Sequence, residues 1–190
     1  MGLVVEGTFD GPTYRTLIAR IRNISALQIR ECGGKSRLKH KFVYFLKELQ
    51  RNAAWQIDIA LVIRDSDCDP PQPIEKQLRN ILSASGFKPE MRVEFFAIPC
   101  MLESWLLSDV DAIRTVAANR EHGVVIAPPN IQIAQANSSG DKEVFTQVLE
   151  HFRLPATPPV YEEIAALASL SLIGNRCNYF REFTRRVKAI

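Results

Sequence analysis

The clearest evidence for the fold in this sequence is the segment IDIALVIRDSD, residues 57–67. Its first half is a nearly continuous apolar run, which is typical of a parallel strand that is covered on both faces. The run ends in acidic residues at every second position, with Asp65 and Asp67 followed by Asp69. Alternate side chains of an extended segment point to the same face, so these acids are expected to point together. The segment predicts a central parallel strand with negative charge at its carboxyl end.

Further strands and helices are expected to alternate on both sides of this segment. Apolar runs predict strands in GLVVEG (2–7), ALQIRECGG (26–34) and MRVEFFAIP (91–99). Helical spacing of apolar residues predicts helices in DGPTYRTLIARIR (10–22), SRLKHKFVYFLKELQRNAA (36–54) and PIEKQLRNILSASG (73–86). Asp10 and Ser36 are candidate N-caps of the first two helices. This alternation predicts an α/β protein with a central, mostly parallel sheet flanked by helices.

The whole chain of 190 residues is expected to form one domain. Its core would span about residues 1–110, and a mainly helical part would span about residues 111–190, interrupted at APPN (127–130), NSSGD (137–141) and LPATPP (154–159). The composition is 46% hydrophobic and 24% charged, with a net charge of +3, which is ordinary for a globular protein. No apolar run reaches the roughly 20 residues of a membrane span, and no signal-peptide pattern is present. We therefore expect a cytoplasmic protein without a membrane partner.

Three common site types are disfavoured by spacing. The cysteines, at positions 32, 68, 100 and 177, form no close pair of the kind that zinc sites use. The segment ECGGKS lacks the first glycine of a nucleotide-binding P-loop, because Ile29 stands at that position. The three histidines share no ligand spacing.

Acidic residues follow three of the four expected strands. Glu6 ends the first strand, Asp65 and Asp67 end the third, and Glu103 closely follows the fourth, while Asp10 lies one helical turn after Glu6. Ligands of open α/β sheets bind outside the carboxyl ends of the strands, so these carboxylates are expected at one rim. Oxygen ligands of this kind suit Mg²⁺ or Mn²⁺. Ordinary structural roles are the alternative: a helix cap for Asp10, a favourable helix-dipole contact for Glu103, a loop after a strand for Asp65 and Asp67, and a turn for Asp69.

The order of these motifs resembles the Toprim domain of topoisomerases, primases and nucleases of the OLD (overcoming lysogenization defect) type. VVEGTFDGPTYRTLI resembles the OLD-type opening, with Glu6 and Asp10 as its two acids, and LVIRDSDCD resembles the family's Asp-x-Asp, carried by Asp65 and Asp67. FFAIPCMLESWLLSD resembles a segment of small stand-alone Toprim-like proteins, carried by Glu103 and Trp105. The resemblance covers about residues 1–110 and implies a Toprim-like (Rossmann-like) fold.

The resemblance also implies an activity, namely metal-dependent cleavage or nicking of nucleic acid, with DNA favoured over RNA. Glu6, Asp10, Asp65, Asp67 and Glu103 would hold Mg²⁺ or Mn²⁺, and Glu6, Asp65, Asp67, Glu103 and Lys142 would be the catalytic residues, with Lys142 on the phosphate. OLD proteins usually carry an ATPase upstream; here it would be a separate partner in a defence or DNA-processing system. A homo-oligomer is compatible with the sequence.

Two basic segments are candidates for DNA contact. GGKSRLKHK places Lys35, Arg37, Lys39 and Lys41 at a helix start, and REFTRRVK (181–188) lies near the carboxyl terminus. Both segments are also typical of a solvated helix face.

Other functional classes remain alternatives. A catalytically silent Toprim-like binding or regulatory module would keep the fold without the chemistry. An Asp-x-Asp after a buried strand also occurs in metal-dependent glycosyltransferases and aspartyl-phosphate phosphotransfer enzymes. The latter need their acids after the first strand, where this chain has Glu6 alone. The former would leave Glu6 and Asp10 without a role.

Overall fold

The computed structural model describes residues 1–24, 26–99, 101–120 and 140–190. Within these ranges, four strands form one parallel sheet in the order β2-β1-β3-β4. Their bounds are Gly2–Val5 for β1, Gln28–Glu31 for β2, Ile59–Asp65 for β3 and Arg92–Ile98 for β4. The parallel sheet with its flanking helices confirms the predicted α/β class.

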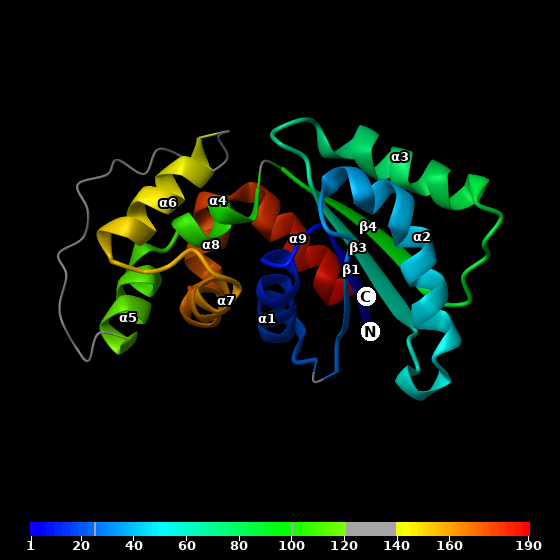
Figure 1. Ribbon diagram of the computed structural model, residues 1–190, viewed down its shortest axis with the longest axis horizontal. Coiled ribbons are helices and arrows are strands. Elements are labelled where there is room, and N and C mark those ends of the chain that lie inside the picture. The colour runs from blue at the N-terminus through cyan, green and yellow to red at the C-terminus, as the bar shows by residue number, and fades with distance from the viewer. Residues whose placement is uncertain (25, 100, 121–139) are drawn as a thin grey trace.

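Helices cover both faces of this sheet (Figure 1). The helix α1 (Asp10–Arg22) lies on one face, and α2 (Lys35–Arg51) and α3 (Pro71–Ala84) lie on the other, with a short 3-10 helix at Ala53–Trp55 after α2. The central strand β3 shows why its sequence is continuously apolar. Leu61 and Ile63 pack in the core that contains α1, whereas Ala60 and Val62 pack in the core that contains α2 and α3.

The described part of the chain after residue 101 is helical. It forms α4 (Leu102–Leu107), α5 (Val110–Arg120), α6 (Asp141–His151), α7 (Pro158–Leu167), α8 (Leu170–Arg176) and α9 (Asn178–Ala189). The first of these helices begins at Leu102. APPN and most of NSSGD lie outside the described residues, whereas LPATPP is irregular up to Thr157 and begins α7 with its last two prolines.

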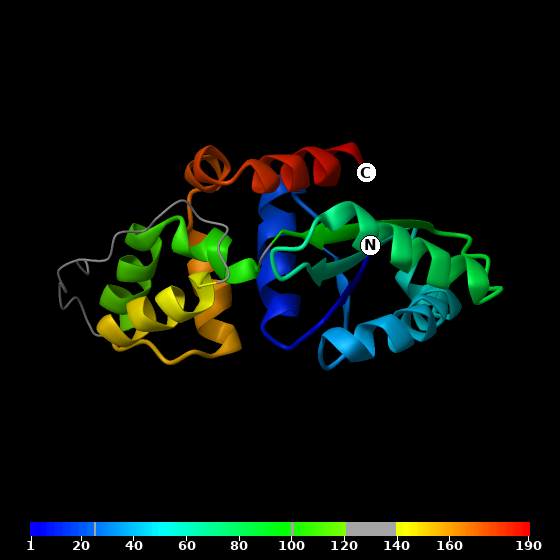
Figure 2. The ribbon, with the colours of Figure 1, turned by 90° about the horizontal axis from the view of Figure 1, so that it is seen from above.

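These helices share a core with one face of the sheet. Figures 1 and 2 show α1 between the sheet and the helices α4–α7, and α9 running along one side of the molecule. In α9, the Arg186 guanidinium donates to Glu75 of α3 and to the Phe95 carbonyl of β4, each at 2.7 Å. The expectation that REFTRRVK is only a solvated face is therefore wrong for Arg186. No helix in the described ranges combines the length and apolar character needed to cross a membrane.

The two expected N-caps differ from the structure. The helix α1 begins at Asp10 itself, and the Asp10 carboxylate accepts a hydrogen bond from the Gly7 N–H at 2.8 Å instead of capping the helix. The helix α2 begins at Lys35, before Ser36, and follows Gly34 at a φ of 119°. A side chain at position 34 would be strained in that conformation, so glycine permits the sharp entry into α2.

Candidate functional site

A cavity of about 460 Å³ lies at the carboxyl ends of β1 and β3. These neighbouring strands continue into connections that leave in opposite directions along the sheet, which is where ligands bind in open parallel sheets. All six candidate residues line this cavity: Glu6, Asp10, Asp65, Asp67, Glu103 and Lys142. The structure thus brings together side chains from four separate parts of the sequence.

Glu6 follows β1 directly and has no hydrogen-bond partner for its buried Oε1 atom among the described residues. The Arg64 Nε atom is 3.5 Å from that oxygen, and Arg64 is itself almost fully buried in β3. Burial, followed by repulsion from Asp10, raises the pKa of Glu6 to about 7, although Arg64 and Lys35 act in the opposite direction. Among the described residues, this Glu6 oxygen is therefore buried without a hydrogen bond and has a long charge contact with Arg64.

Asp10 and Asp65 lie on the α1 side of the cavity. Burial is the main cause that raises the pKa of Asp10 to about 6, and the charges of Glu103 and Glu31 add to it. Asp65 ends β3 and accepts a hydrogen bond from the Tyr14 hydroxyl at 3.2 Å. Burial, and then the charges of Asp10 and Glu6, raise the pKa of Asp65 well above its usual value. Each carboxyl group thus makes ionisation of the others less favourable.

Asp67 lines the cavity, but it is not placed there by the strand alternation that its spacing predicted. The strand ends at Asp65, and Asp67 has a positive φ of 51° in the turn that follows, so strand alternation does not align the acids. The exposed Asp67 carboxylate forms an ion pair with Lys35 of α2. Asp69 does not line the cavity; its N–H and carbonyl both hydrogen-bond to Ser66, as expected of a turn residue.

Glu103 and Lys142 meet on the side formed by the later helices. Glu103 is buried in the first turn of α4 and accepts a hydrogen bond from the Tyr161 hydroxyl at 3.3 Å. The Lys142 Nζ atom lies 3.9 Å from the same Glu103 oxygen. The Lys142 side chain is otherwise largely exposed, so its ammonium group can reach a ligand in the cavity.

The donor chemistry of the cavity fits a hard divalent cation. No group of three or more His, Cys, Asp or Glu side chains in the described ranges is arranged to hold a metal ion by itself. Asp67 and Glu103 are each paired with a lysine, which accounts for two of the five carboxylates. Mg²⁺ commonly uses only one or two protein carboxylates, with water and substrate phosphate completing the shell. The Glu6 oxygen that has no hydrogen bond in the described part of the chain could supply such a ligand, and so could the Asp65 carboxylate.

Three residues at this site were not predicted. Tyr14 and Tyr161 come from α1 and α7, and each donates to a carboxylate more than fifty residues away in the sequence. No local pattern identifies such contacts. Arg64 did carry a signal, because a charged residue inside a buried apolar strand requires a partner.

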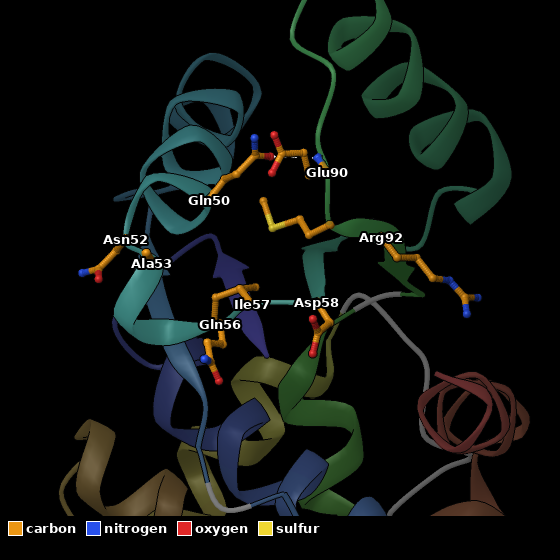
Figure 3. Close-up of a pocket in the computed structure, with 9 residues that line it drawn as sticks. Gln50, Asn52, Ala53, Gln56, Ile57, Asp58, Glu90 and Arg92 are labelled. Carbon is orange, nitrogen blue, oxygen red and sulfur yellow. Dashed lines mark hydrogen bonds between the residues drawn. The ribbon is translucent and has the colours of Figure 1, made fainter.

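A larger cavity, of about 740 Å³, lies near the opposite ends of the strands, before β3 and β4 (Figure 3). Gln50 and Glu90 face each other there, and the Gln50 side chain accepts a hydrogen bond from the Glu90 N–H at 2.9 Å. Arg92 points away from the other labelled side chains. Two acids, Asp58 and Glu90, are among the described residues that line it, against five in the smaller cavity, so size alone does not make it the better candidate.

The smaller cavity is therefore the candidate functional site. Its carboxylates shift one another's pKa values, and its lysines come from different helices. Perturbed titratable groups of this kind are typical of functional sites. Comparisons of the chain with protein-family models, with curated proteins and with solved structures found no match.

Proposed function

We propose that this protein is a Mg²⁺- or Mn²⁺-dependent nuclease of the Toprim, OLD-like type that cleaves or nicks DNA. One observation is the main support for this proposal. A single cavity gathers the residues that the sequence resemblance implies to be metal-binding or catalytic: Glu6, Asp10, Asp65, Asp67, Glu103 and Lys142. Residues scattered over the chain would have no reason to converge if each served only its own helix or strand. The convergence supports a shared function.

The residues divide into roles according to their surroundings. Glu6, Asp10, Asp65 and Asp67 would bind the cations. The first three must lose a proton to do so, because their pKa values are raised in the metal-free cavity. Tyr14 would hold the Asp65 carboxylate in place, and Tyr161 would do the same for Glu103. A pair of bound metal ions would supply a nucleophilic water and stabilise the leaving oxygen of the phosphodiester.

Lys142 is the candidate for charge neutralisation on the phosphate. Its side chain is largely exposed at the cavity, and its Nζ atom lies 3.9 Å from a Glu103 oxygen. A flexible ammonium group in this position can contact a phosphate oxygen as negative charge develops there. DNA outside the cavity would follow the basic start of α2, where Arg37 and Lys41 are exposed. A separate ATPase would regulate the reaction in the cytoplasm.

Metal-dependent relaxation of a supercoiled plasmid tests this function. Wild-type protein with Mn²⁺ or Mg²⁺, alone and with a neighbouring ATPase gene product, should nick the plasmid, and EDTA should stop the reaction. Asp67→Asn should lower the rate at least about 100-fold, because a carboxylate at the metal site is lost while an exposed turn residue carries little packing. Asp69→Asn is the matched control: the residue is in the same turn but outside the cavity, and its activity should stay at the wild-type level.

Two results would contradict the proposal. If neither duplex DNA, single-stranded DNA nor RNA is cut with the ATPase present, the chain is a catalytically silent module. If Asp67→Asn cuts as fast as the wild type, the activity comes from a contaminating nuclease.

A further inference from the structure

Lys35 lines the cavity at the carboxyl ends of β1 and β3 from the side opposite to Lys142. It is the first residue of α2, which covers one face of the sheet, whereas Lys142 belongs to α6 among the later helices (Figure 1). Both lysines line the cavity. The charge of Lys35 acts on Glu6, and the charge of Lys142 acts on Asp10. The acids are therefore compensated from two sides by different residues.

The ion pair between Lys35 and Asp67 is suited to exchange. The Lys35 side chain is 35% exposed and the Asp67 side chain 59% exposed, so water screens their attraction. Pairs of this kind contribute little to stability. Lys35 also has a flexible stem, which lets its ammonium group move within the cavity without a change in α2.

Metal binding would change the balance of charge at Asp67. A divalent cation held by Glu6, Asp65 and Asp67 attracts the Asp67 carboxylate more strongly than one ammonium group does, and it repels that ammonium group. A substrate phosphate brings negative charge into the same cavity. The ammonium group then gains more from the phosphate than from a carboxylate that already binds metal.

We propose that Lys35 is a second catalytic lysine, which leaves Asp67 when the metal binds and contacts the substrate phosphate opposite Lys142. This inference rests on the proposed metal-dependent function. In the metal-free protein Lys35 is paired with Asp67, a proposed metal ligand. In the metal-bound protein Lys35 would instead bind the phosphate. Lys35 therefore weakens metal binding and strengthens phosphate binding, which a purely structural lysine would not do.

Calorimetric titration of the full chain with Mn²⁺ and then with inorganic phosphate tests this exchange. Lys35→Gln removes the competing cation and should tighten Mn²⁺ binding by about two- to tenfold. With saturating Mn²⁺, the same variant should bind inorganic phosphate about tenfold more weakly, because a charged hydrogen bond is lost. Lys35→Arg keeps the charge and should stay within about twofold of the wild-type Mn²⁺ affinity. Lys76→Gln, on an exposed residue of α3 outside the cavity, should match the wild type in both titrations.

The outcomes separate this inference from the function on which it rests. If wild-type protein does not bind Mn²⁺, the metal-dependent function itself is wrong. If the wild type binds Mn²⁺ and Lys35→Gln binds it equally well or more weakly, Lys35 does not compete with metal and the exchange is wrong. If Mn²⁺ binding tightens but phosphate binding is unchanged, Lys35 is only a counter-ion and has no catalytic contact.

Discussion

At the scale of single residues, opposing effects act on the Glu6 carboxyl group. Burial and the neighbouring Asp10 favour its protonated form, whereas Arg64 and Lys35 favour its charged form. The resulting pKa of about 7 means that Glu6 keeps a proton for part of the time near neutral pH. Without metal, the cavity therefore does not carry the full charge of its five carboxylates.

The raised pKa values make the stability of the metal-free protein depend on pH. The folded state retains protons on Glu6 and Asp10 that the unfolded chain has lost, so stability should fall as the pH rises from about 4, through the folded pKa values of about 6 and 7. Denaturant titrations in EDTA at pH 5 and pH 7.5 measure this difference. Glu6→Gln should show a smaller fall than the wild type, because one titrating group is removed. If the wild type is as stable at pH 7.5 as at pH 5, or more stable, burial does not raise the pKa values of these carboxyl groups.

The positions of the acids after the predicted strands were sufficient to predict that they gather at one site. They were not sufficient to predict the backbone geometry that places each acid there. Glu6 and Asp65 follow from strand ends, which the apolar runs mark in the sequence. Asp67 reaches the cavity through a left-handed turn that its alternating spacing does not indicate. The contacts of Tyr14 and Tyr161 depend on how distant helices pack, and short-range patterns carry no such information.

At the scale of elements, α4 shows how a short helix can position a catalytic candidate. All six residues of Leu102–Leu107 are buried, including Glu103. Trp105 anchors the helix through edge or tilted contacts with Phe180 and Phe183 of α9, at ring-centroid distances of 4.9 and 5.0 Å. The position of Glu103 therefore depends on packing between α4 and the last helix of the chain.

Truncation of this anchor should destabilise the protein. Trp105→Ala should lower the free energy of unfolding by about 3–5 kcal/mol, because it removes a large, fully buried ring. Trp105→Phe should cost much less: it retains a ring and removes an indole N–H that is buried without a partner among the described residues. Urea denaturation followed by circular dichroism measures both. A small loss in Trp105→Ala would mean that α4 is not anchored by this contact.

The alternation of elements was predictable up to β4 because each strand and helix has its own apolar period. The later helices were predicted only as a helical region, and their order in space was not predicted. Arg186 illustrates the reason. Its sequence neighbours are typical of a solvated face, but its guanidinium lies 4.0 Å from the centre of the Phe96 ring and donates to two other elements.

At the scale of the whole molecule, the cavity joins two parts of the fold. The sheet and α2 supply Glu6, Asp65, Asp67 and Lys35, and the later helices supply Glu103 and Lys142. A cation bound between them would add attraction where the metal-free protein has repulsion between carboxylates. Metal binding should therefore stabilise the molecule as a whole.

Thermal unfolding with and without Mn²⁺ measures this stabilisation. At a hundredfold excess over the dissociation constant, a ligand that binds only the folded state adds about 2.7 kcal/mol. For a chain of this length that corresponds to a rise of about 5–10 °C in the midpoint. The double variant Asp65→Asn, Asp67→Asn should lose this rise, and without metal it should be at least as stable as the wild type because repulsion is reduced. A full metal-dependent rise in the double variant would place the binding site elsewhere.

The place of β1 in the sheet also sets an order of assembly. The first strand of the chain is a central strand, in which Gly2 pairs with Gln28 on one side and with Ala60 on the other. Pairing of β1 with β2 closes a short loop of the chain. Pairing of β1 with β3 closes a longer loop, so it costs more conformational entropy. During synthesis Glu6 leaves the ribosome well before Asp65 exists. We expect the acids to meet late in folding, so relief of their repulsion should slow unfolding more than it speeds folding.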